Sequence, residues 1–202
     1  MDANSEQTQA VYQENAVAYD AQRSRALFEA RWLARFTACL PDGGRVLDLG
    51  CGAGEPIAQW FIAEGFRLTG IDFAGAMLDI ARARWPHGDW RLADMRVLDL
   101  SETFDGIIAW NSFFCLTKDE QRLTLGRMAR HLAPGGALLF TIAPEVCETP
   151  DTVAGQRVFQ ANLSLIEYAT LLEANGLRLT AYMAEDPDCK CQSIIMARKK
   201  KD

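Results

Sequence analysis

The 202-residue sequence predicts an α/β fold, in which a mainly parallel sheet carries helices on both faces. From Arg45 onward, short apolar runs alternate with amphipathic stretches of helical periodicity. Strands that alternate with helices imply right-handed crossovers, which lay successive strands side by side in parallel. The last two apolar runs, 177–184 and 192–197, are separated by a turn that is too short for a parallel crossover. We therefore expect them to form an antiparallel hairpin at one edge of the sheet.

The other elements are expected in chain order from the same alternation. Strands are expected at 45–50, 67–72, 89–94, 104–110 and 136–143. Helices are expected from about residue 56, through 77–85, from about 118 to 131, and at 167–175. Ser164 and Glu167 have the spacing of a capping box for the last helix, which Gly176 ends. A loop is expected between Pro150 and Ser164.

The N-terminal region is expected to be helical. Apolar positions in residues 5–38 recur at helical spacing, with a break between Tyr19 and Ser24, which predicts two helices. We expect residues 1–40 to form a helical cap and residues 41–202 to form the α/β part of a single compact domain.

Composition excludes several classes of function. The chain is 49% hydrophobic, which allows a core without disulfides or metals, and its net charge of -6 would repel nucleic acid and anionic membranes. The N-terminal stretch is polar and no window has the uncharged length of a membrane span, so we expect a cytoplasmic protein. Six scattered cysteines and two isolated histidines predict reduced thiols and no metal site.

The strongest local signal is a glycine-rich turn between the strand at 45–50 and the next helix. Gly50, Gly52 and Gly54 permit a tight turn and leave no side chain between the backbone and a ligand. Pro56 suits the first turn of a helix. Alone, this pattern fits a simple strand-to-helix connection as well as it fits ligand binding.

Acidic residues near this turn favour a nucleoside ligand over a dinucleotide. A dinucleotide fingerprint has a glycine at the position held here by Glu55, whose carboxylate would repel a pyrophosphate. Asp72 ends the second strand, where it can accept hydrogen bonds from ribose hydroxyls, and Asp94 ends the third strand. Helix N-capping would explain either aspartate alone. Together with the glycines, they predict a nucleoside site.

These features resemble the class I S-adenosylmethionine-dependent methyltransferase family. The resemblance rests on DLGCGAG at 48–54, Asp72, Asp94-Met95 and LAPGGALLF at 132–140. It implies a Rossmann-like seven-stranded, mainly parallel sheet with one antiparallel strand, in agreement with the C-terminal helix and hairpin. The runs GEPIA, FDGIIAWNSFFCL and EDPDC further resemble a bacterial subgroup of small enzymes that methylate small molecules.

The resemblance implies that the chain binds S-adenosylmethionine and releases S-adenosylhomocysteine. It assigns the ribose hydroxyls to Asp72, the adenine amino group to Asp94, an adenine face to Met77 and the region of the sulfonium to Asn111. Arg23 is expected to pair with the carboxylate of the cofactor, although a solvated amphipathic flank explains it equally well. The residues expected at the cofactor are Tyr19, Arg23, Asp48, Gly50, Cys51, Gly52, Gly54, Asp72, Phe73, Met77, Asp94, Met95 and Asn111.

The acceptor is expected beyond the ends of the fourth and fifth strands. The fourth strand ends without the Asn/Asp-Pro-Pro-Tyr or Phe motif, which argues against amide and nucleobase amine acceptors. Asn111 is the candidate positioning residue, and Cys115 is a weaker alternative because a buried thiol would be inert. The residues expected to line the acceptor pocket are Trp110, Phe113, Phe114 and Phe159. For Phe113 and Phe114, a role in anchoring the next helix is the alternative.

The predicted reaction is transfer of a methyl group to a small-molecule acceptor by in-line displacement, for which alignment supplies most of the rate. Two alternatives stay open. One is an NAD-dependent oxidoreductase, and the other is a non-catalytic protein that senses the same cofactor. We expect a monomer or a homodimer.

Overall fold

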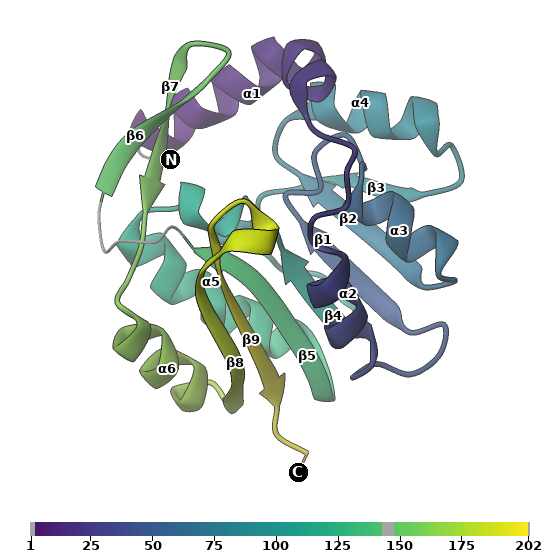
Figure 1. Cartoon of the computed structure of the whole chain (residues 1–202), viewed down its shortest axis with the longest axis vertical. Coiled ribbons are helices and arrows are strands. Elements are labelled where there is room, and N and C mark those ends of the chain that lie inside the picture. The colour runs from purple at the N-terminus through teal and green to yellow at the C-terminus, as the bar shows by residue number, and fades with distance from the viewer. Residues whose placement is uncertain (1–2, 143–147, 202) are drawn as a thin grey trace.

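The computed structural model describes residues 3–142 and 148–201. Its helices are α1 (Ala3–Gln22), α2 (Ala30–Thr37), α3 (Ile57–Ala63), α4 (Gly75–Arg84), α5 (Lys118–His131) and α6 (Leu165–Ala174). Its strands are β1 (Arg45–Leu49), β2 (Arg67–Asp72), β3 (Asp89–Leu92), β4 (Phe104–Ala109), β5 (Leu132–Ile142), β6 (Glu148–Val153), β7 (Gln156–Ala161), β8 (Leu177–Asp186) and β9 (Gln192–Lys199). Short 3-10 turns follow three strands: η1 (Met95–Val97), η2 (Phe113–Cys115) and η3 (Pro187–Cys189). Figure 1 shows their arrangement.

The predicted sheet is confirmed. Seven strands lie in the order β3-β2-β1-β4-β5-β9-β8. The pairs from β3 to β5 are parallel, and β9 runs antiparallel to both of its neighbours. The order reverses between β1 and β4, because the chain builds outward to β3 before it returns to the other side of β1. Such a switch point opens a crevice at the carboxyl ends of the strands.

The two faces of the sheet carry separate hydrophobic layers. On one face, α5 and α6 supply Leu125, Met128, Tyr168 and Leu172. On the other, residues of α2, α3 and α4 pack over β1 and β4. The side chains from these three helices are Trp32, Leu33, Phe36, Ile57, Ala58, Phe61, Leu78 and Ala81. Because α2 belongs to this layer, it packs on the sheet itself.

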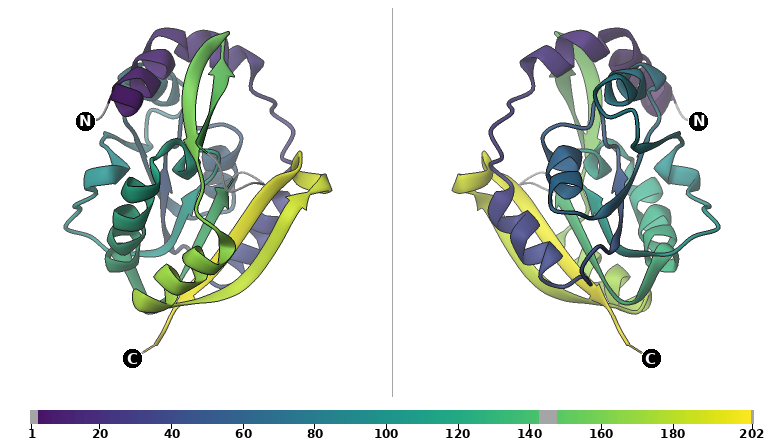
Figure 2. Two further views of the ribbon diagram at one scale, coloured as in Figure 1. Left: turned by 90° about the vertical axis from the view of Figure 1, so that its left-hand side faces the viewer. Right: turned by 90° about the vertical axis from the view of Figure 1, so that its right-hand side faces the viewer.

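Helix α1 instead packs against α4 and the glycine-rich turn. Ala16 lies in a small cluster with Ala53, Ala74 and Met77, and Tyr12 and Tyr19 pack beside them. The helix is kinked at Asn15. Figure 2 shows α1 crossing above the end of the sheet.

Strands β6 and β7 form a separate two-stranded hairpin where the sequence predicted a loop, so this prediction was wrong. The hairpin extends from the sheet toward α1 (Figures 1 and 2). Its turn consists of Ala154 and Gly155, both at positive φ, the conformation that two-residue hairpin turns favour. Residues 148–153 read ETPDTV and lack alternating apolar residues, so the period of a half-buried strand is absent from the sequence. The expected strand end at Ala143 falls outside the described residues.

The capping box predicted for α6 is only half formed. The hydroxyl of Ser164 accepts a hydrogen bond from the backbone N–H of Glu167, but the Glu167 carboxylate accepts one from Arg122 of α5. A complete box occurs at α5 instead, between Thr117 and Glu120. An ion pair with a neighbouring helix therefore competes with the local cap.

Candidate functional site

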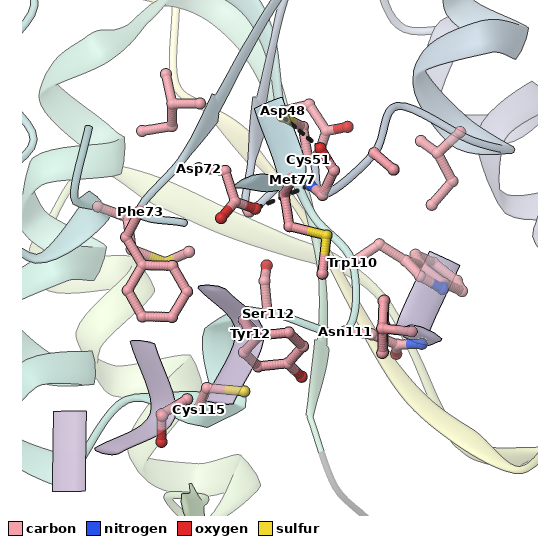
Figure 3. Close-up of a pocket in the computed structure, with 18 of the residues that line it drawn as sticks. Tyr12, Asp48, Cys51, Asp72, Phe73, Met77, Trp110, Asn111, Ser112 and Cys115 are labelled. Atoms are coloured by element: carbon pink, nitrogen blue, oxygen red, sulfur yellow. Dashed lines mark hydrogen bonds between the residues drawn. The ribbon is translucent and has the colours of Figure 1, made fainter. Parts of the chain in front are cut away.

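A cavity lies at the carboxyl ends of β1, β2 and β4, with α1 along one wall (Figure 3). It encloses about 1100 Å³, including the solvent at its mouth. Most of the predicted site residues meet here. Those that line it are Tyr19, Arg23, Asp48, Gly50, Cys51, Gly52, Asp72, Phe73, Met77, Asp94, Met95, Trp110, Asn111 and Cys115.

The glycine-rich turn forms the floor of the cavity. Gly50 and Gly52 both have positive φ, which side chains disfavour. A Cβ at Gly50 would collide with the side chain of Ser112, whose hydroxyl donates to the Leu49 carbonyl at 2.5 Å. A Cβ at Gly52 would meet no atom within 4 Å. Gly50 therefore permits close packing of β1 on the segment after β4, and the backbone at Gly52 faces open space.

Asp72 fastens this turn to the end of β2. Its two carboxylate oxygens accept hydrogen bonds from the backbone N–H groups of Gly52 and Ala74, each at 2.9 Å. The side chain is buried, and burial raises the pKa of Asp72 to about 6, although the backbone hydrogen bonds oppose the shift. A carboxylate with two of its lone pairs engaged can still accept further hydrogen bonds.

Asp48 is a second buried carboxyl beside Asp72. Burial is the main cause that raises the pKa of Asp48 to about 7, and the nearby Asp72 carboxylate adds to the shift, whereas Arg23 opposes it. The two carboxyls and the Cys51 thiol lie together on the same side of the cavity in Figure 3. Burial and both carboxylates raise the pKa of Cys51, which keeps that thiol protonated. This corner of the cavity favours a cationic group.

Asp94 makes contacts that its sequence position did not reveal. Its carboxylate accepts hydrogen bonds from Arg96 through the backbone N–H at 2.8 Å, Nε at 2.9 Å and Nη2 at 2.5 Å. Arg96 also pairs with Glu120 of α5 at 3.2 Å. The N-capping alternative is therefore realised, with Asp94 still at the cavity wall.

Asn111 is held in place by Thr141 of β5. The Thr141 hydroxyl accepts from the Asn111 backbone N–H at 2.7 Å and donates to the side-chain Oδ1 at 3.3 Å. Asn111 has a φ of 53°, in the left-handed region that asparagine tolerates better than most residues. Thr141 is fully buried, and sequence reasoning did not find it because it lies inside an apolar run.

Tyr12, Tyr19 and Arg23 bring α1 and the residue just after it into the site. The Tyr12 ring stands edge-on to Tyr19, with centroids 5.3 Å apart, and lies 6.2 Å from the Phe73 ring. Burial raises the pKa of the Tyr19 hydroxyl. The Arg23 guanidinium lines the cavity and pairs with the buried Glu29 at 3.2 Å.

Four predicted site residues are not among the described residues that line the cavity. Gly54 faces the core, where its Cβ would lie 3.1 Å from Trp90. Phe113 is fully buried against the rings of Phe140 and Tyr168, at 5.2 and 6.5 Å between centroids. The structure thus supports the anchoring alternative for Phe113, which does not line this cavity.

Phe114 and Phe159 are likewise not among the residues that line this cavity. Phe114 is buried in η2, directly before Cys115, which does line the cavity. Phe159 lies on β7, where its backbone N–H donates to the Thr8 hydroxyl of α1 at 3.3 Å. These aromatic positions therefore give no wall to the cavity.

Other lining residues were missed because their types carry no distinctive motif. They are Thr8, Asp20, Ala53, Ile57, Ile71, Ala93, Arg96, Ser112 and Leu116. Of these, Thr8 and Asp20 come from α1, whose packing depends on tertiary contacts.

No group of three or more His, Cys, Asp or Glu side chains in residues 3–142 and 148–201 is arranged to hold a metal ion. Within the same ranges, no helix is both long and apolar enough to cross a membrane. His131 has a structural role, since its Nε2 accepts from the Leu100 N–H at 2.8 Å and its Nδ1 lies 2.7 Å from the Arg127 carbonyl.

Comparison with known proteins bears on the class of this fold. Residues 46–136 match a family described as a methyltransferase domain. The chain is 37% identical over 99 residues to dTDP-4-amino-2,3,4,6-tetradeoxy-D-glucose N,N-dimethyltransferase of Saccharopolyspora spinosa, covering 48% of this chain and 39% of that protein. It is 37% identical over 134 residues to cypemycin N-terminal methyltransferase of a Streptomyces species, covering 63% of this chain and 54% of that one. Both matches thus span only part of the relative.

A solved structure has the same fold over the whole chain. The 1,6-didemethyltoxoflavin-N1-methyltransferase of Burkholderia thailandensis superimposes with a TM-score of 0.73 at 22% identity, covering 100% of this chain and 92% of that one. The sheet order defines a Rossmann-like α/β protein, and the cavity lies at its switch point. Over residues 46–136 the chain is similar to a methyltransferase domain, and both relatives named above are methyltransferases.

Proposed function

We propose that this chain binds S-adenosylmethionine in the cavity and transfers its methyl group to a small-molecule acceptor. The observation that carries the proposal is the meeting of the glycine-rich turn, Asp72 and Asn111 around one cavity at the switch point of the sheet. These three features come from the ends of three different strands, and a parallel sheet brings such ends to one edge.

The residues present fit this cofactor. Asp48 and Asp72 are buried carboxyls with raised pKa values, so a cation beside them would favour their ionised forms. The open space at Gly52 lets the backbone approach a ligand closely. Tyr12, Phe73 and Met77 supply apolar surface for a planar ring.

We assign the parts of the cofactor as follows. Asp72 accepts hydrogen bonds from the ribose hydroxyls with its remaining lone pairs, and Met77 packs on the adenine. Asp94 takes the adenine amino group only by sharing the oxygens that Arg96 occupies, so its contribution is smaller than that of Asp72. Arg23 pairs with the carboxylate of the cofactor while it keeps its contact with Glu29, since a guanidinium has five donors.

When bound, the cofactor supplies an activated methyl group on a sulfonium. The chain aligns the acceptor with it: Asn111, braced by Thr141, presents a polar side chain, and the largely buried Trp110 excludes water. Asn111 is the proposed positioning residue, and Cys115 is the weaker candidate. We propose no general base, because alignment can supply most of the rate.

The cap of residues 1–40 enters the proposal through α1, which lies over the cavity, whereas α2 packs on the sheet. We also propose that the protein works in the cytoplasm as a monomer or homodimer. Cysteines 39, 51, 189 and 191 are free thiols, which suits a reducing compartment. Sedimentation analysis will give the oligomeric state.

The test is a comparison of ligands by calorimetry, followed by methyl transfer to a panel of small acceptors. We expect S-adenosylmethionine and S-adenosylhomocysteine to bind and NAD to compete with neither. Binding of NAD without binding of S-adenosylhomocysteine would overturn the assignment in favour of the oxidoreductase alternative. Cofactor binding without turnover of any acceptor would instead support the non-catalytic sensor.

A further inference from the structure

Glu55 has a role that its place in the glycine-rich turn did not suggest. The sequence predicted that its carboxylate keeps a pyrophosphate away, but in the structure it is paired. Its Oε2 lies 2.7 Å from Nε of Arg25 and 3.5 Å from Nη1 of Arg84. The end of the glycine-rich turn is thereby tied to the segment after α1 and to the last turn of α4.

Asp20 of α1 completes this group. Its Oδ1 accepts from Nη1 of Arg84 at 2.7 Å and from Nη2 of Arg25 at 2.9 Å, and its Oδ2 accepts from Nη2 of Arg84. Arg25 also donates to the backbone carbonyl of Asp20 at 2.9 Å. We call Asp20, Arg25, Glu55 and Arg84 the clasp.

The clasp is balanced in charge and partly shielded from solvent. Its carboxylate side chains are 12% and 18% exposed, and those of Arg84 and Arg25 are 28% and 40% exposed. Hydrogen bonding to Arg84 lowers the pKa of Asp20, so the carboxylate stays ionised. A network of ion pairs with bidentate arginine–carboxylate contacts has a better defined geometry than an isolated surface ion pair.

The clasp sits where α1 ends above the cavity. Asp20 and Glu55 both line the cavity, and so do Tyr19 and Arg23 on either side of Asp20 in the chain. Farther along α1, Gln9 donates to the Phe73 carbonyl at 2.7 Å and Gln13 accepts from the Ala76 N–H at 3.0 Å. The middle of the helix is therefore held to Phe73 and to the first turn of α4 by these bonds, and its C-terminal end is held by the clasp.

We propose that the clasp residues are positioning residues for methyl transfer, which hold Tyr19 and Arg23 over the bound cofactor and thereby set its rate of release. This inference rests on the proposed function. On this proposal, Glu55 at the end of the glycine-rich turn is the residue to which the C-terminal end of α1 is attached through Arg25 and Arg84.

The test measures dissociation of S-adenosylhomocysteine from the full chain by stopped-flow displacement. The variants are Asp20→Asn, Arg84→Gln and the double variant, and Arg122→Gln is the matched control. Arg122 also bridges two carboxylates, those of Asp119 and Glu167, but it lies outside the residues that line the cavity. We expect each clasp variant to release the ligand about tenfold faster, and the double variant to add little, because both single variants disrupt the same Asp20–Arg84 pair.

Salt gives a second readout that a general loss of stability would not produce. Ions screen a partly exposed network, so release from the wild type should accelerate between low and high ionic strength. The double variant should show a much weaker dependence. Thermal unfolding of all variants shows whether the clasp variants lose more stability than Arg122→Gln does.

Two outcomes would overturn the inference. One is release from the folded clasp variants at the wild-type rate. The other is acceleration of the same size in Arg122→Gln, because the effect would then follow from lost stability. Failure of the wild type to bind S-adenosylhomocysteine at all would instead refute the proposed function, so the two failures are distinguishable.

Discussion

Asp72 connects the glycine-rich turn, the end of β2 and the proposed ribose site through one carboxylate. Replacing it with alanine removes the acceptor for Gly52 and Ala74 N–H groups and for the ribose hydroxyls. We expect Asp72→Ala to weaken S-adenosylhomocysteine binding by about 2 to 4 kcal/mol, because partly buried donors lose their partner. Calorimetry measures the change.

The control is Asp89→Ala, which removes a carboxylate from the start of β3 that pairs with Arg91 outside the cavity lining. It should leave the dissociation constant unchanged. If Asp72→Ala is folded and binds the ligand as tightly as the wild type does, Asp72 has no part in the site.

Asp48 should make stability fall as the pH rises. Its pKa is about 7 in the folded protein, against 3.8 ordinarily. Between about pH 4 and pH 7 the unfolded chain loses this proton while the folded chain keeps it, so the folded state becomes less favoured. Below this window Asp48 contributes nothing, and above it the penalty is constant. Asp72, with a pKa of about 6, adds a contribution of the same sign.

We therefore expect Asp48→Asn to gain stability relative to the wild type as the pH rises from 4.5 to 8. Urea unfolding at several pH values measures the difference between the two proteins, which removes the titration of groups that do not interact with Asp48. A difference that stays constant over this range would show that Asp48 does not titrate with a raised pKa.

At the scale of elements, η2 lies between β4 and α5 and is anchored to the core by a buried aromatic ring. Phe113 packs on Phe140 of β5 and Tyr168 of α6 and is fully buried. We expect Phe113→Ala to lower the free energy of unfolding by about 3 to 5 kcal/mol, because it leaves a cavity in the core. Denaturant unfolding measures this loss.

Phe28→Ala is the matched control. Because Phe28 is 40% exposed, its replacement should lower the free energy of unfolding much less. Cofactor affinity of the folded fraction should stay unchanged in Phe113→Ala. A stable Phe113→Ala variant with a raised acceptor KM would return this residue to the acceptor pocket.

The elements that the sequence predicted well are those whose environment follows a simple period. Helix α5 begins and ends as predicted, at Lys118 and His131, because its cap and its apolar stripe lie within one segment. The β6–β7 hairpin was missed because it packs against α1 outside the seven-stranded sheet, and residues 148–153 show no alternation of apolar and polar types. The periodicity of apolar residues in the sequence predicts burial only where one face of a helix or strand is buried along its length.

At the scale of the whole molecule, the cavity joins segments that are far apart in the chain. Residues of α1, the glycine-rich turn and the end of β4 all line it. We expect S-adenosylhomocysteine to slow amide hydrogen exchange in α1 and in residues 48–54 together, because one ligand contacts both. Exchange measured by mass spectrometry with and without the ligand checks this, with α6 as the internal control.

Protection of the glycine-rich turn without α1 would contradict the covering role of α1. Equal protection of α6, which packs on the far face of the sheet from α2, α3 and α4, would indicate a general stabilisation and not local contact.

The sequence by itself determined the sheet, its closing hairpin and the strand-end residues of the site, among them Asp48, Asp72 and Asn111. Strands that alternate with helices are joined by right-handed crossovers, and the carboxyl ends of parallel strands meet at one edge of the sheet. The position of a residue along the chain is therefore enough to predict that these residues lie close together. Only the tertiary structure decided which aromatic residues face the cavity, that Arg96 occupies the Asp94 carboxylate, and that Glu55 joins the clasp. Those outcomes depend on side chains of other elements that arrive at the same place, and local spacing carries no information about such encounters.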